Sequence, residues 1–108
     1  MATEQLLQSW KRTEGYLRDA RAHLSEAAEG ICADEIHEFN HYLEHNELEL
    51  ALDALEAAFK KWSGGSLRVL ELMALAAASM GLNERQAAYD EHLSKARGWQ
   101  YQTRLPPS

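Results

Sequence analysis

The chain has 108 residues, of which 45% are hydrophobic and 26% charged. This balance is typical of one soluble globular domain and excludes a disordered chain. The net charge is −6, and the single cysteine, Cys32, excludes an intrachain disulfide. No apolar run is long enough for a secretory signal or a membrane span, so we expect a cytoplasmic protein.

The acidic residues are concentrated in the middle of the chain. Residues 22–59 contain ten acids and no Lys or Arg, whereas the rest contains seven acids and eleven bases. Such an anionic field repels nucleic acid and anionic membranes and attracts basic surfaces. We therefore expect no nucleic-acid partner and no membrane partner.

Helical periodicity runs through most of the sequence, and strand signals are missing. The first predicted helix starts after Thr3, a plausible N-cap, and ends at Gly30. Gly15 lies inside it and can bend it. Its predicted core stripe consists of Leu6, Trp10, Leu17, Leu24 and Ile31.

The second and third helices are predicted to form an antiparallel hairpin around Asn46. Asp34 is the expected cap of the second helix, which ends near His45. Asn46 with Glu49 resembles a capping box that opens the third helix. The expected core faces are Ile36, Phe39, Tyr42 and Leu43 in the second helix, and Leu48, Ala51, Leu52, Leu55, Phe59 and Trp62 in the third.

A polar, glycine-containing break at residues 63–66 separates this hairpin from two further helices. Ser66 is the expected cap of a helix over 67–80 that is apolar on most sides, so we expect it to be central and buried. Gly81 ends this helix, and Asn83 with Gln86 suggests a capping box for the next one. The expected inward stripe of that last helix is Ala88, Tyr89, His92 or Leu93, and Ala96.

The chain is predicted to end in an extended tail. Gly98 ends the fifth helix, after Arg97, and residues 98–108 follow without helical periodicity. We expect Trp99, Tyr101 and Leu105 to pin the tail to the bundle. The sequence thus predicts an all-α fold, a single helical domain over residues 1–108 with about five helices and a C-terminal tail.

His37, His41 and His45 recur every four residues on the side of the second helix opposite its core face. This spacing lets two imidazoles hold one metal ion. A catalytic zinc also needs a third ligand in a sheltered cavity, whereas the third histidine here lies further along the same solvent-facing side. We therefore predict no metal site and no cofactor, and keep a His/Glu metal-binding bundle as an alternative.

The absence of positive charge over 38 residues predicts a docking face for a basic partner. Ordinary helix surfaces mix both signs, because pairs four residues apart attract and like charges repel. Leu50 projects away from the core stripe, and within an acidic rim it either anchors a partner or meets the neighbouring helix. The predicted contact residues are Glu38, His41, Glu44, His45, Glu47, Glu49, Leu50, Asp53 and Glu56.

No residue is predicted to be catalytic. Nothing in the sequence near Cys32 indicates an activated thiolate, so we expect a buried or partly buried structural thiol. The sequence contains no Gly-rich phosphate loop, nucleophile elbow or CxxC pair. We therefore do not expect an enzyme.

The segment EFNHYLEHNELELALDALEAA, followed by LRVLELMALAAASMGL, resembles the helical immunity proteins of bacterial polymorphic-toxin systems. The likeness is to the MafI-type family and its contact-dependent-inhibition relatives, and it covers roughly residues 34–82. It implies a cytoplasmic protein that binds and blocks the toxic domain of a cognate effector, often a nuclease. That agrees with the charge argument, since a nuclease active site is basic.

A helical-repeat scaffold is the alternative from another class. The segment HYLEHNELELALDALEAA also looks like one tetratricopeptide-type hairpin. Residues 79–96 would be a degraded second copy, with Ala51 and Ala87 in register. Two such units are too few for a stable solenoid.

Overall fold

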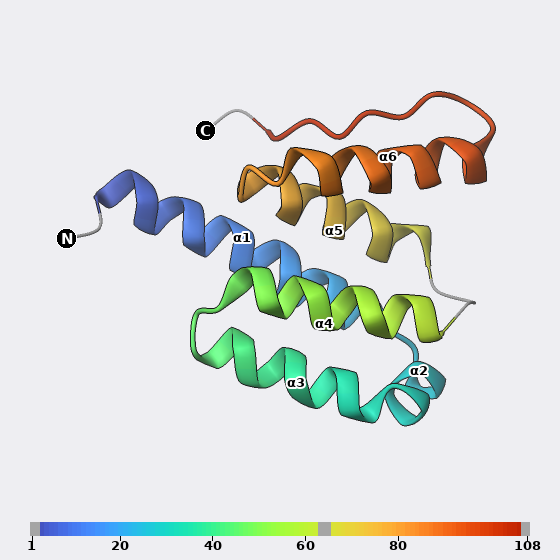
Figure 1. The fold of residues 1–108 in the computed structure, drawn as a ribbon, viewed down its shortest axis with the longest axis horizontal. Coiled ribbons are helices and arrows are strands. Elements are labelled where there is room, and N and C mark those ends of the chain that lie inside the picture. Colours follow the sequence, from blue (N-terminus) through green and yellow to red (C-terminus); the bar gives the residue numbers. More distant parts are fainter. Residues whose placement is uncertain (1–2, 63–65, 107–108) are drawn as a thin grey trace.

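The computed structural model describes residues 3–62 and 66–106, and within these ranges the chain forms six α-helices and no strand (Figure 1). The predicted all-α class is therefore confirmed, with six helices in place of about five. The helices are α1 (Glu4–Ala22), α2 (Glu26–Ile31), α3 (Ala33–Glu44), α4 (Leu48–Lys61), α5 (Leu67–Ser79) and α6 (Asn83–Arg97).

The additional helix arises because the predicted first helix is two. The chain leaves α1 after Ala22, and Ser25 accepts a hydrogen bond from the backbone N–H of Ala28 at 3.1 Å, which caps α2. Gly30 lies inside α2 and does not end a helix, contrary to the prediction.

The predicted stripe of the first helix is wrong at both ends, where Leu6 and Ile31 are exposed. The first turns of α1 project beyond the other helices (Figure 1), and Leu6 in these turns is 43% exposed. Ile31 follows the change of direction at Ser25, which takes it out of the α1 stripe. Gly15 lies inside α1, as predicted.

Other helix ends were predicted correctly. Thr3 caps α1, and Ser66 caps α5 through its hydroxyl. Gly81 and Gly98 follow α5 and α6 with φ of 74° and 80°. Glycine is favoured at both positions because a side chain costs energy in the left-handed region.

Asn46 closes α3, and the prediction that it caps α4 is wrong. Its φ is 57°, in the left-handed region that asparagine tolerates better than most residues. The N–H of Asn46 donates to the carbonyl of Leu43 at 3.1 Å, and that of Glu47 donates to Tyr42 at 2.8 Å. This pair of bonds satisfies two carbonyls at the end of α3. The predicted antiparallel hairpin around Asn46 is present.

Two further capping predictions are wrong. Asp34 and Asn83 lie inside the first turns of α3 and α6, where they already belong to the helix. The positions before these helices are Cys32 and Leu82, neither of which makes a side-chain capping bond. In these cases the chain enters the new helix directly from the preceding turn.

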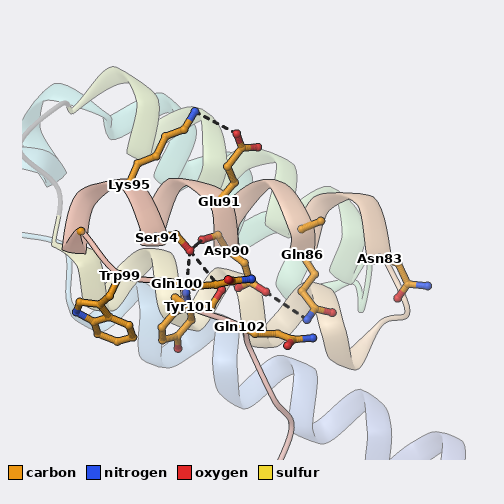
Figure 2. Close-up of a pocket in the computed structure, with 12 residues that line it drawn as sticks. Asn83, Gln86, Asp90, Glu91, Ser94, Lys95, Trp99, Gln100, Tyr101 and Gln102 are labelled. Carbon is orange, nitrogen blue, oxygen red and sulfur yellow. Dashed lines mark hydrogen bonds and ion pairs between the residues drawn. The ribbon is translucent and has the colours of Figure 1, made fainter.

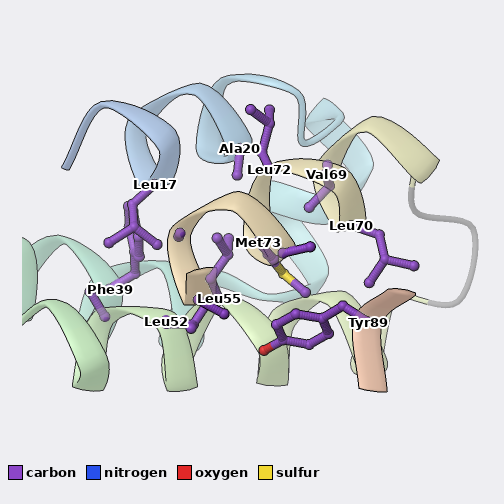
Figure 3. Packing of buried hydrophobic residues seen from close by; sticks show 14 of the residues in the cluster. Leu17, Ala20, Phe39, Leu52, Leu55, Val69, Leu70, Leu72, Met73 and Tyr89 are labelled. Carbon is purple, nitrogen blue, oxygen red and sulfur yellow. The ribbon is translucent and has the colours of Figure 1, made fainter. Parts of the chain in front are cut away.

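One hydrophobic core is shared by α1 and the hairpins α3–α4 and α5–α6. Helix α1 packs mainly on α5 and also on α4, and so connects the two hairpins (Figure 1). Helix α5 is central, as predicted: it packs against α1, α4 and α6, and seven of its residues are buried. Figure 3 shows side chains of five helices converging, among them Leu17, Phe39, Leu55, Met73 and Tyr89.

The inward face of α6 differs from the prediction. Tyr89 and Leu93 are buried as expected, but Ala88, His92 and Ala96 are exposed, and the third buried residue is Asp90. Asp90 is tolerated in the interior because its carboxylate accepts bonds from the tail.

The tail runs back along α6 (Figure 1). Tyr101 packs against the core as expected, but Trp99 is 58% and Leu105 36% exposed. The buried tail residue is Thr103, whose N–H donates to Asp90 at 3.0 Å. Polar bonds, more than the predicted apolar pins, therefore fix the tail. In the part of the chain that the structure describes, no helix has the length and apolar character to cross a membrane.

Candidate functional site

The predicted contact residues lie on the outer side of α3, in the turn after it and on α4. Helix α3 turns Ile36, Phe39 and Leu43 into the core, so the positions between them face outward. Eight of the nine predicted residues are exposed, and seven of these eight lie within residues 38–50, around the turn between α3 and α4. We call these seven the turn surface: Glu38, His41, Glu44, His45, Glu47, Glu49 and Leu50.

The acids of the turn surface have no internal counter-ion. Among the described residues, no Lys or Arg forms an ion pair with Glu38, Glu44, Glu47 or Glu49. Leu50, in the first turn of α4, is 43% exposed. The turn surface thus combines one exposed apolar side chain with carboxylates that have no Lys or Arg partner in the described chain.

Asp53 and Glu56, the other two predicted contact residues, are paired with a cation of the same molecule, although Asp53 is exposed and Glu56 is partly buried. Arg85 of α6 forms ion pairs with Asp53 and, at 3.5 Å, with Glu56. Tyr89 donates a hydrogen bond to Glu56 at 2.6 Å. Their negative charges are therefore largely neutralised by Arg85, and these contacts join α4 to α6.

The environment of Glu56 holds its carboxylate ionised. Partial burial alone would raise the pKa, but the Tyr89 hydrogen bond and the nearby Arg85 and Lys60 outweigh it and lower the pKa of Glu56. Burial and the bond to Glu56 raise the pKa of Tyr89 in turn. The cluster thus consists of a neutral donor between a carboxylate and a guanidinium.

Two further acids of the middle segment are also neutralised. Arg21 pairs with Glu29 at 2.6 Å, and Lys61 pairs with Glu35 at 3.1 Å. The fold thus brings cations from outside residues 22–59 to one part of the acidic segment. The uncompensated charge that remains is concentrated at the turn surface, with Glu26 and Asp34 near the other end of α3.

The histidines lie as the helix spacing predicts. The rings of His41 and His45 are 4.5 Å apart, and Nδ1 of His45 lies 2.8 Å from the carbonyl oxygen of His41. All three histidines of the row are exposed. Within the described ranges, no group of three His, Cys, Asp or Glu side chains is placed to hold a metal ion.

Cys32 is a buried thiol, as expected. Its Sγ–H donates to the carbonyl of Ala58 at 3.4 Å. Burial, followed by the charge of Glu35, raises the pKa of this thiol. The raised pKa keeps it protonated and weakly nucleophilic at neutral pH.

Two of the hollows on the described part of the surface lie away from the turn surface. A cleft of about 530 Å³ lies between α4, α5 and α6, with Phe59, Leu70 and Met73 in its lining. An open groove separates α6 from the tail and is lined mainly by polar side chains (Figure 2). Sequence reasoning did not find either hollow, because each depends on which elements pack together in the fold.

Sequence reasoning also missed the polar residues that connect elements. Arg85 reaches Asp53 across 32 positions, and Asp90 binds Thr103 across 13. The one available signal was an acid on the inward side of α6, four residues after Gln86. The carbonyl of Thr103 accepts a bond from that glutamine at 3.1 Å.

Comparisons with protein-family models, curated proteins and solved structures gave no match for this chain.

Proposed function

We propose that this protein is a cytoplasmic immunity protein that binds the toxic domain of a cognate effector and neutralises it by stoichiometric occlusion. The observation that carries the proposal is the turn surface. Four other acids of the middle segment, Glu29, Glu35, Asp53 and Glu56, are paired with Arg or Lys, whereas among the described residues no such pair is formed by Glu38, Glu44, Glu47 or Glu49. The resemblance of residues 34–82 to MafI-type immunity proteins supports the same function.

The chemistry of the turn surface fits a basic partner. A nuclease active site carries positive charge to hold phosphates, and an uncompensated acidic surface complements it and accelerates encounter. Leu50 supplies an exposed apolar side chain on the same surface, which would pack against the partner while the acids form a polar rim. Occupation of the basic site then excludes the nucleic acid without any reaction.

The first experiment is co-expression with the C-terminal domain of a secreted toxin encoded immediately upstream of this gene. We expect the chain to rescue growth and to form a 1:1 complex that abolishes the toxin's activity. The absence of an adjoining toxin gene, or toxicity that persists at excess of this protein, would refute the immunity function.

Two charge-reversal variants test whether the toxin binds at the turn surface. The variant Glu44→Lys, Glu47→Lys, Glu49→Lys should slow toxin association at least about tenfold at low salt. The control Asp19→Lys, Glu84→Lys, Glu91→Lys changes the net charge equally at exposed positions outside the turn surface. Equal slowing in both variants would show that net charge, and not this surface, guides the partner.

A helical interaction scaffold is the second candidate, and the cleft between α4, α5 and α6 favours it. Its apolar lining could hold a hydrophobic peptide side chain. The proposed repeat register has less support, because Ala51 is fully buried whereas Ala87 is exposed. Ala88→Trp would fill the cleft; it should abolish peptide binding by a scaffold and leave toxin neutralisation intact.

A further inference from the structure

The tail lies along α6 as an extended segment that is bound through alternate residues. The N–H of Tyr101 donates to Ser94 Oγ at 2.8 Å, and that of Thr103 donates to Asp90 at 3.0 Å. Figure 2 shows Ser94 and Asp90 on the side of α6 that faces the tail. Two residues of an extended chain advance about 6.6 Å and four residues of a helix about 6.0 Å, so the two spacings match.

This alternation leaves the outer side of the tail free. In an extended chain, the N–H and C=O of successive residues point to opposite sides. Within the described chain, the backbone groups of Gln100, Gln102 and Arg104 form no hydrogen bond, and their side chains are exposed. We call these three backbone positions the tail edge. An unpaired edge of this kind is a template for another strand.

The tail edge is self-complementary. In an antiparallel pair centred on Gln102, this residue faces its own copy and Gln100 faces Arg104 of the other copy, with about six backbone hydrogen bonds. Trp99 lies three positions before Gln102, and Leu105 lies three positions after it. In this register, the exposed Trp99 of one copy therefore faces the exposed Leu105 of the other copy. No like charges face one another in this register.

The distribution of charge also permits a second copy to bind here. The tail and α3 lie at opposite edges of the molecule, whose extents are 41 × 34 × 19 Å (Figure 1). At physiological salt, charges are screened beyond about 8 Å, so the acids of the turn surface do not oppose pairing through the tail. Pairing through the tail also leaves the turn surface open.

We propose that two copies of this protein associate through antiparallel pairing of their tails about a twofold axis at Gln102. The inference is independent of the proposed toxin-binding function. The interface is small, because one short strand pair buries far less than a standard interface of about 1,600 Å². We therefore expect a weak, concentration-dependent dimer.

Sedimentation velocity of the full chain over a wide concentration range tests the association. Gln102→Pro removes an N–H that is unpaired in the monomer and should abolish the dimer with little change in thermal stability. Gln102→Ala keeps that N–H and should still dimerise. A protein that stays monomeric up to millimolar concentration, or a dimer that Gln102→Pro leaves intact, overturns the proposal.

Disulfide cross-linking tests the register. Residues in a hydrogen-bonded antiparallel pair have Cα atoms about 5.5 Å apart, which suits a disulfide. Gln102→Cys should therefore cross-link on mild oxidation, whereas two Gln100→Cys residues lie about 13 Å apart and should not. Cys32 is fully buried and gives little background. Equal cross-linking at both positions overturns the register.

A strand of another protein is the competing occupant of the tail edge. Amide exchange of Gln100, Gln102 and Arg104 separates the two cases. Protection that grows with the concentration of this chain alone supports self-pairing. Protection that appears only when a toxin domain is added overturns it.

Discussion

Hydrogen bonds of individual polar side chains fix the relative positions of the helices at the edge of the apolar core. Tyr89 is the clearest case, because its hydroxyl donates to Glu56 and accepts from Arg85 at 3.0 Å. The ring belongs to the core while the hydroxyl reaches the rim of α4. One residue thus contributes both burial and a charge-assisted hydrogen bond, which is stronger than a neutral one.

Replacement of this hydroxyl should weaken the fold. We expect Tyr89→Phe to lower the free energy of unfolding by about 1.5–3 kcal/mol at neutral pH, because Glu56 loses a donor in a partly buried place. Urea unfolding followed by circular dichroism measures the change. Tyr16→Phe is the matched control, since no hydrogen bond of the Tyr16 hydroxyl is found in the described chain. Equal destabilisation by both variants would contradict the role of the Tyr89 bond.

The loss of stability caused by Tyr89→Phe should also depend on pH. The pKa of Glu56 is lowered in the folded state, so its stabilisation is present above the unfolded value of 4.5 and is lost as the pH falls through the folded value. In Tyr89→Phe the folded pKa moves back toward the ordinary value. The difference in stability between the two proteins should therefore shrink between about pH 6 and pH 3. A difference that stays constant over this range would show that the hydroxyl does not act through Glu56.

At the scale of elements, the same chain reversal ends two of the helices. After α5, Leu82 donates to the carbonyl of Ala77 at 2.9 Å and Gly81 donates to Ala78 at 3.1 Å. The bonds around Asn46 repeat this pattern after α3. Gly81 indicates a helix end in the sequence, because glycine is favoured at this position. Asn46 is ambiguous, because asparagine also caps the starts of helices.

Asn46 therefore gives a prediction about the α3–α4 turn. Asn46→Val should destabilise the protein by about 1–2 kcal/mol, because a β-branched residue is strained at φ 57°. Asn46→Gly should be neutral or stabilising. Asn40→Val makes the same replacement at an exposed position inside α3, where the two residues have similar helix propensity. Thermal unfolding compares the three variants, and equal losses for Asn46→Val and Asn40→Val would contradict the assignment.

Local signals predicted several of the helix ends, but not the break between α1 and α2. Thr3 and Ser66 cap helices and Gly81 ends one, since each acts on backbone groups within four residues of itself. Ser25, followed by acidic residues at Glu26 and Glu29, carried the same kind of signal. The apolar stripe that continues through it obscured the break, because periodicity does not reveal a change of helix direction.

At the scale of the whole molecule, the charge pattern predicted the candidate site only in part. The sequence places ten acids in one segment, but the fold decides which of them meet a cation. Arg85 neutralises Asp53, 32 positions away, and Lys61 reaches Glu35 from the end of α4. Such pairs depend on tertiary packing, so sequence alone could not separate the paired acids from the turn surface.

The core likewise belongs to the whole molecule and not to either hairpin. Leu52 of α4, Met73 of α5 and Leu93 of α6 are fully buried in one cluster with Leu17 of α1. Because α1 contacts both hairpins, neither can lose its partner without exposing apolar surface. We therefore expect the hairpins to unfold together, unlike the units of a helical-repeat protein, where each contacts only its neighbours.

Met73→Ala tests this cooperativity. The cavity should cost about 2–5 kcal/mol, and native-state hydrogen exchange should show the same loss in the most protected amides of α4 and of α6. Leu50→Ala is the control: Leu50 is 43% exposed, so its truncation should cost far less stability. A loss confined to α5 and α6 would mean that the hairpins are separate folding units. Such a result would favour the scaffold alternative, because separable hairpins are what a repeat architecture requires.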